Sequence, residues 1–147
     1  MAVSVRESRT VWTGDVQNGK GVLNGVSGAF KDVEITLPKR AQQGDTTSPE
    51  EFLAAAHSSC LAMNLAATLT QNGTPPEELD VTSKVGFGPK DGGGFEIKHA
   101  NVTIKGKVPG MSEDDFRKLA EQAEQTCPVA SLFRGNTEQK VDIQFEG

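Results

Sequence analysis

The stretch SPEEFLAAAHSSCLAM, residues 48–63, decides the fold because it begins a long apolar helix that carries one of only two cysteines. Ser48 is a good N-cap, Pro49 suits the first helical position, and Glu51 completes a capping box. The helix is predicted to run to about Gln71, where an Asn-Gly pair provides a C-terminal stop. Because the helix is apolar around most of its circumference, we expect it to be buried, either deep in the fold or against a partner subunit.

Segments in which apolar and polar residues alternate flank this helix and predict strands, the first three of which look like an antiparallel meander. The predicted strands lie at residues 3–12, 21–26, 33–37, 79–87, 95–108 and 141–145. A second helix, capped by Ser112 and ending near Thr126, and a short helix through Phe133 precede the last strand. The order of strands, helix, strands, helices and strand is an α+β pattern. Without a linker or internal repeat, residues 1–147 are predicted to form a single domain.

Composition argues against several classes of protein. A net charge of −5 opposes binding to nucleic acid, and an aromatic content of 5% without tyrosine offers no platform for stacking bases. No apolar run looks long enough to span a bilayer and the N-terminus lacks a signal sequence, so no membrane partner and a cytoplasmic location are expected. His57 and His99 are the only histidines and do not have metal-ligand spacing. Neither a metal nor a cofactor is therefore expected.

Cys60 and Cys127 are the only cysteines of the chain. In the cytosol a pair of thiols is more often catalytic or sensing than structural, and thiolate chemistry needs one sulfur to attack and a second to resolve the product. Cys127 precedes Pro128, so it is predicted to cap a short helix whose dipole favours the thiolate. Cys60 lies in mid-helix and needs a nearby cation. The residues alone do not decide which sulfur attacks first, and either cysteine could be an inert thiol.

Three polar residues are candidates for tuning Cys60. Arg40 lies in the polar segment before the helix and could lower the pKa of the thiol. Glu50 lies ten residues before Cys60, which is about 15 Å along a straight helix. It could therefore reach Cys60 only across a dimer interface, or act indirectly by orienting an arginine. His57 lies one turn from Cys60 and could act as a base, although a buried and hydrogen-bonded histidine explains this position better.

These segments resemble the OsmC/Ohr family of osmotically inducible and organic-hydroperoxide-resistance proteins over essentially the whole chain. The resemblance is carried by WTGD with GKG, TSPEEFLAAAHSSC and CPVAS, at residues 12–15, 19–21, 47–60 and 127–131. The first motif and the Ala-Ala-His before the first cysteine resemble the OsmC branch more than the Ohr branch. The resemblance implies an OsmC-like fold, with antiparallel sheets wrapped around a central apolar helix in an intertwined homodimer.

The resemblance further implies a thiol-dependent peroxidase that reduces organic hydroperoxides to alcohols in defence against oxidative or osmotic stress. Cys60 would be the peroxidatic thiolate, and Cys127 the resolving thiol that condenses with the sulfenic acid into a disulfide. An external dithiol reductant, of dihydrolipoyl type, would restore both thiols. The Arg and Glu that the family places beside its reactive cysteine match Arg40 and Glu50, with Arg9 as the fallback for the arginine. A paired arginine can outweigh a helix end, so this assignment is preferred to the dipole argument for Cys127.

Two other functions share part of this pattern. A hot-dog-like acyl-binding or thioesterase domain also wraps antiparallel sheet around a central apolar helix, but it does not require Cys127. A non-catalytic redox sensor would use the same pair of thiols without being recycled by dithiols. The activity of a Cys127→Ser protein and the dependence of turnover on dithiol therefore separate the three possibilities.

Overall fold

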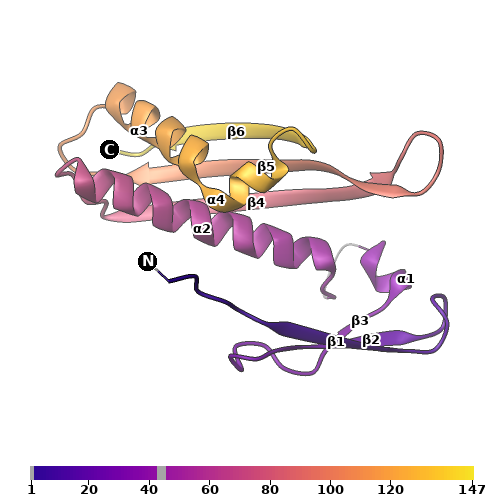
Figure 1. Ribbon diagram of the computed structural model, residues 1–147. Coiled ribbons are helices and arrows are strands. Elements are labelled where there is room, and N and C mark those ends of the chain that lie inside the picture. The colour runs from indigo at the N-terminus through magenta and orange to yellow at the C-terminus, as the bar shows by residue number, and fades with distance from the viewer. Residues whose placement is uncertain (1, 43–45) are drawn as a thin grey trace. The chain divides into compact units, whose positions relative to one another are not determined.

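The computed structural model describes residues 2–42 and 46–147, and the chain divides into two compact units, Met1–Pro49 and Glu50–Gly147. The elements follow one another as three strands, a short helix, a long helix, two strands, two helices and a strand (Figure 1). This is the α+β order that the sequence predicts, whereas the single domain over residues 1–147 stays a prediction. The two units are described in turn.

The first unit contains a three-stranded antiparallel meander of β1 (Ser8–Thr13), β2 (Lys20–Gly25) and β3 (Val33–Ile35). The turn between the first two strands is built on Asp15, whose carboxylate accepts the backbone N–H of Asn18 at 2.8 Å. In a turn the backbone N–H groups have no partner on a neighbouring strand, and an Asp side chain of the same turn can accept their hydrogen bonds instead. The predicted meander is confirmed.

A short helix, α1 (Leu37–Arg40), follows the meander. The sequence predicts strand through residues 33–37 and a polar loop beyond it, and this boundary is wrong by two residues. Thr36 is the reason, because its side chain accepts the backbone N–H of Lys39 at 3.3 Å and so caps a helical turn. Arg40 therefore lies at the end of a helix rather than in an extended loop.

The second unit is built on a three-stranded sheet of β4 (Glu78–Pro89), β5 (Phe95–Lys107) and β6 (Glu138–Phe145), in the order β4-β5-β6. The first two strands form a long antiparallel hairpin, and the turn between them has glycines with positive φ at residues 92–94. β6 is parallel to β5. A parallel pair requires a crossover connection, which two helices provide here.

Three helices contribute to the second unit: α2 (Pro49–Gln71), which belongs to it from Glu50 onward, α3 (Glu113–Thr126) and α4 (Pro128–Phe133). The bounds of α2 agree with the predicted helix. The helices lie on one face of the β4-β5-β6 sheet, as Figure 1 shows, and the hydrophobic core fills the space between them. The core consists of Leu61, Leu65, Leu69, Val102, Ile104, Val108, Phe116, Ala120, Ala123, Cys127, Ala130 and Ile143.

Only one face of α2 is buried in the core. Leu61, Leu65 and Leu69 are fully buried at helical spacing, whereas Met63 on another face is 75% exposed. Within the described residues α2 is also the one helix long and apolar enough to cross a membrane, with a mean hydropathy of 1.3 over 18 residues. The expectation that no run reaches that length is therefore wrong. A helix whose leucines pack into a protein core meets the same criterion.

Candidate functional site

The two cysteines meet inside the second unit. Cys60 projects from α2 and is partly buried, packed against the core cluster to which the fully buried Cys127 belongs. Both are free thiols, and Cys60 lies near enough to Cys127 to raise the pKa of the Cys127 thiol. Sixty-seven positions of sequence separate them, so the packing of α3 and α4 onto α2 brings them together.

Cys127 occupies the junction between two helices. It ends α3, where its backbone N–H donates to the Glu124 carbonyl at 3.3 Å, and it caps α4, where its Sγ accepts the Ala130 N–H at 3.5 Å. The predicted helix cap is thus confirmed. The thiolate expected from the helix dipole is not supported, because the pKa of Cys127 is raised. Burial is the largest cause, and the Cys60 thiol raises the pKa further. The hydrogen bond from the Ala130 N–H lowers it but does not cancel these effects. The raised pKa favours the neutral thiol at Cys127.

His57 lies one turn before Cys60 and is only 1% exposed. Its Nδ1 lies 2.8 Å from the Ser83 hydroxyl on β4, and its ring contacts Phe133 with 5.1 Å between centroids. Nε2 is buried and has no hydrogen-bond partner in the described part of the chain. Burial lowers the pKa of His57, partly opposed by the negative charge of Glu124. The imidazole is therefore a neutral, packed group that hydrogen-bonds neither thiol.

A partly buried ion pair beside Cys127 was missed in the sequence. Arg134, just after α4, places Nη2 at 3.0 Å from Glu124 Oε1 and 3.1 Å from the backbone carbonyl of the same residue. The Glu124 side chain is 9% exposed, and Gln125 donates to its other oxygen at 3.2 Å. The two charges are ten residues apart, one on α3 and one just after α4, so no helical spacing reveals the pair.

The polar residues predicted to act on Cys60 lie in different parts of the chain. Glu50 is buried in the first turn of α2, about 15 Å along the helix from Cys60. Arg40 ends α1 in the first unit, and the fallback Arg9 is exposed on β1 of the same unit. The structure thus brings the two cysteines near each other, whereas the roles of Arg40 and Glu50 stay predictions.

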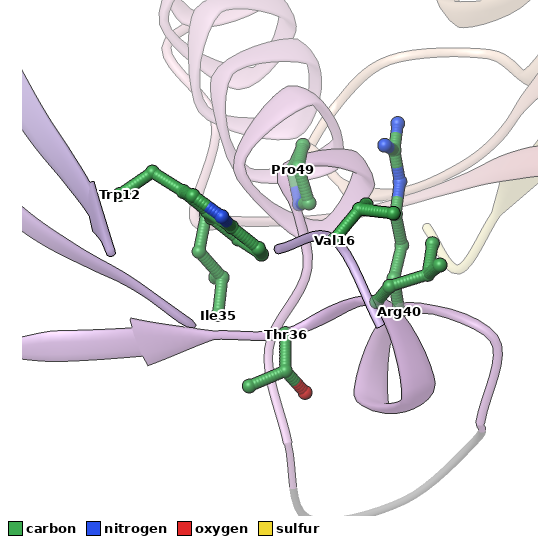
Figure 2. A pocket seen from close by; sticks show the side chains of 7 residues that line it. Trp12, Val16, Ile35, Thr36, Arg40 and Pro49 are labelled. Carbon is green, nitrogen blue, oxygen red and sulfur yellow. The ribbon is translucent and has the colours of Figure 1, made fainter. Parts of the chain in front are cut away.

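A small apolar pocket lies beside Arg40 in the first unit (Figure 2). It has a volume of about 120 Å³ and is lined by Trp12, Val16, Ile35, Thr36, Leu37, Arg40 and Pro49. The Trp12 ring forms one wall, and its indole N–H donates to the Gly14 carbonyl at 2.9 Å. Arg40 contributes its aliphatic stem and extends the guanidinium beyond the other lining side chains. The pocket can hold a small apolar group next to a cation.

Metal ligation has no support among the described residues. Residues 2–42 and 46–147 contain no cluster of three or more His, Cys, Asp or Glu side chains that could hold an ion. The chemistry that these side chains offer is that of a thiol pair.

Comparison with known proteins finds a family model and several relatives that match most of the chain. The family model described as "OsmC-like protein" matches residues 42–142. The protein named peroxiredoxin OsmC of Escherichia coli K12 is 29% identical over 129 residues, covering 88% of this chain and 90% of that protein. A Staphylococcus epidermidis protein named organic hydroperoxide resistance protein-like 2 is 33% identical over 113 residues, covering 74% of this chain and 77% of that protein.

Solved structures share the fold along nearly the whole chain. An organic hydroperoxide resistance protein from Elizabethkingia anophelis aligns with a TM-score of 0.79 at 25% identity, covering 98% of both chains. The organic hydroperoxide resistance protein OhrB of Bacillus subtilis aligns with a TM-score of 0.75 at 20% identity, covering 97% of this chain and 100% of that one. The second likeness concerns the fold alone.

Proposed function

Because this chain belongs to the OsmC-like family, we propose that it is a thiol-dependent peroxidase that reduces organic hydroperoxides to alcohols. The observation that carries the proposal is the proximity of two free cysteines, a partly buried Cys60 and a fully buried Cys127. Relatives named peroxiredoxin and organic hydroperoxide resistance protein support the same chemistry.

The first step takes place at Cys60. Its thiolate attacks the terminal oxygen of the hydroperoxide, the O–O bond breaks, and the two products are a Cys60 sulfenic acid and an alkoxide. The alkoxide takes a proton from solvent and leaves as the alcohol. The assignment of Cys60 as the attacking sulfur fits its partial exposure, and it fits the raised pKa of Cys127, which favours the neutral thiol there.

The second step forms the disulfide. The Cys127 sulfur attacks the sulfur of the Cys60 sulfenic acid, an S–S bond replaces the S–O bond, and the hydroxyl leaves with the thiol proton as water. A dithiol, which we propose to be of dihydrolipoyl type, then reduces this disulfide by thiol–disulfide exchange and is itself oxidised to a disulfide. The cycle requires no metal or cofactor.

Arg40 and Glu50 complete the proposed site. A guanidinium beside Cys60 would stabilise both the attacking thiolate and the leaving alkoxide. Glu50 would hold the guanidinium through a charge-assisted pair. Because Glu50 lies about 15 Å along α2 from Cys60, its action requires a second chain or an intervening arginine. We propose that the protein is a cytoplasmic homodimer, which would also cover the exposed face of α2.

The decisive experiment measures dithiol-dependent turnover of cumene hydroperoxide, tert-butyl hydroperoxide and hydrogen peroxide. Turnover should favour the organic peroxides and vanish in Cys60→Ser. Ser59→Ala is the matched control, because the Ser59 hydroxyl bonds its own helix at 2.6 Å and takes no part in the proposed chemistry. Full activity in Cys60→Ser would overturn the assigned roles.

Other outcomes select among the alternative functions and arginines. Oxidation that stops after one turnover despite dithiol would favour a redox sensor, and peroxide-independent acyl binding would favour a hot-dog-like domain.

Arg40→Lys should lower the rate of Cys60 oxidation, because an ammonium cannot reproduce the guanidinium fork. Arg9→Lys is its matched partner and should leave the rate unchanged; the reverse pattern would assign the role to Arg9.

A further inference from the structure

The junction between α3 and α4 fixes the position of the Cys127 sulfur. On the α3 side the Cys127 backbone N–H is bonded to the Glu124 carbonyl at 3.3 Å. On the α4 side the Cys127 carbonyl accepts from the Ser131 N–H at 3.1 Å, and the sulfur itself accepts from Ala130. Each of these contacts is weak by itself, so the sulfur depends on the two helix ends keeping their mutual geometry.

Arg134 closes this junction from the far end of α4. Its Nη2 donates to the Glu124 carbonyl, the same oxygen that accepts the Cys127 N–H, and pairs with the Glu124 carboxylate. A cation on the last carbonyls of α3 also opposes the negative end of that helix dipole. One guanidinium therefore ties the end of α3 to the end of α4, with Cys127 between them.

Placement of this sulfur matters for the second step of the proposed cycle. A disulfide demands Cα atoms within about 7 Å and a narrow range of torsion angles. If the Cys127 sulfur strays, the Cys60 sulfenic acid persists and reacts with a second hydroperoxide to give a sulfinic acid and another alcohol. The ratio of disulfide to sulfinic acid therefore measures how well Cys127 is held.

We propose that Arg134 is a positioning residue for Cys127, that Glu124 anchors it, and that this clamp directs the oxidised Cys60 toward the disulfide rather than toward over-oxidation. The inference rests on the proposed function for its peroxide chemistry, and on the bonds at the junction for its geometry. Arg134 acts through the backbone of Glu124 and does not touch the reacting atoms.

The test exposes the reduced proteins to excess cumene hydroperoxide without dithiol and measures disulfide and sulfinic acid by intact-mass spectrometry. Arg134→Met loses both bonds to Glu124, so the ratio of disulfide to sulfinic acid should fall by at least about tenfold, the effect of losing one charge-assisted hydrogen bond. Arg134→Lys should restore part of the ratio. Glu124→Gln should lower it less than Arg134→Met, because the bond to the Glu124 carbonyl survives. The rate of the first oxidation at Cys60 should be unchanged in all three.

Arg117→Met is the matched control. Arg117 also pairs with a carboxylate of α3, Glu113 at 3.6 Å, and donates to the Ile143 carbonyl at 3.3 Å, but it lies away from Cys127. Its ratio should equal that of the wild type. Circular dichroism checks that Arg134→Met and Arg134→Lys are folded. If the folded variants give the wild-type ratio of disulfide to sulfinic acid, the proposed clamp is overturned.

A second arm separates this inference from the proposed function. Diamide closes vicinal thiols into a disulfide without any peroxide, and the closure should be slower in Arg134→Met than in the wild type. If the wild type consumes no hydroperoxide, the peroxidase proposal fails, whereas the diamide rates still decide the clamp. Equal rates of diamide closure in Arg134→Met, Glu124→Gln and wild type would overturn the clamp. If Arg134→Met did not fold, the comparison of Glu124→Gln with wild type would decide the question alone.

Discussion

Replacement of His57 by asparagine should remove a pH-dependent part of the protein's stability. His57 is 1% exposed, its Nδ1 bonds Ser83 at 2.8 Å, and its Nε2 is buried with no partner in the described residues. Burial lowers its pKa from the ordinary value of 6.5, and the charge of Glu124, itself paired with Arg134, only partly opposes this. The amide of the substituted asparagine could keep a hydrogen bond to Ser83 without titrating.

The sign of the effect follows from proton linkage. Between the lowered native pKa and the unfolded value of 6.5, the unfolded chain binds a proton at His57 that the native protein does not. The free energy of unfolding therefore falls as the pH drops through this window, with a slope of at most about 1.4 kcal/mol per pH unit from this one group. Above the window His57 is neutral in both states and contributes no pH dependence.

The assay is urea denaturation of the reduced proteins at several pH values from neutrality down to about 5, where histidine titrates. The difference in unfolding free energy between wild type and His57→Asn should shrink as the pH falls, because the carboxylates are common to both. Ser83→Ala is the control, since it removes the hydrogen bond and leaves the titrating ring in place. Parallel curves for wild type and His57→Asn would refute a buried, neutral His57.

Three further outcomes test the core and the thiol pair. Leu65→Ala should lower the free energy of unfolding by about 2–5 kcal/mol in urea denaturation, since Leu65 is fully buried, and a loss like that of an exposed site would contradict this packing. Gly106→Ala should destabilise by about 1–3 kcal/mol because its Cβ would overlap the Phe116 ring, and Phe116→Leu should recover part of this in a double-mutant cycle; strict additivity would argue against the overlap. Iodoacetamide at neutral pH should alkylate Cys60 before Cys127, since Cys127 is buried with a raised pKa, and peptide mass spectrometry showing the opposite order would contradict its neutral state.

Features set by neighbouring residues were predictable from the sequence. The 23-residue helix α2 ends where its capping and stop signals predict, and Cys127 caps α4 as its position before Pro128 indicates. The three-stranded meander and the glycine turn of the β4–β5 hairpin also follow local rules. Each of these signals acts within one turn of helix or one hairpin, so no knowledge of packing is required.

Features set by packing were not predictable. Whether the dipole or burial controls Cys127 depends on the residues that surround it, and burial wins only because α3 and α4 close over the core. The bond between Arg134 and Glu124 joins two segments whose separation has no helical period. The parallel pairing of β6 likewise depends on the path of the crossover, which alternation of apolar residues does not reveal.

The parallel pairing of β6 has a consequence for the order in which the molecule assembles. The β4–β5 hairpin makes sequence-local contacts and can form early, whereas β6 can join β5 only after the intervening crossover has been laid down. That crossover carries Cys127, so the sulfurs of Cys60 and Cys127 come together only once its helices have packed against α2. Until then the chain holds two separated thiols, and no local segment of sequence can bring them together.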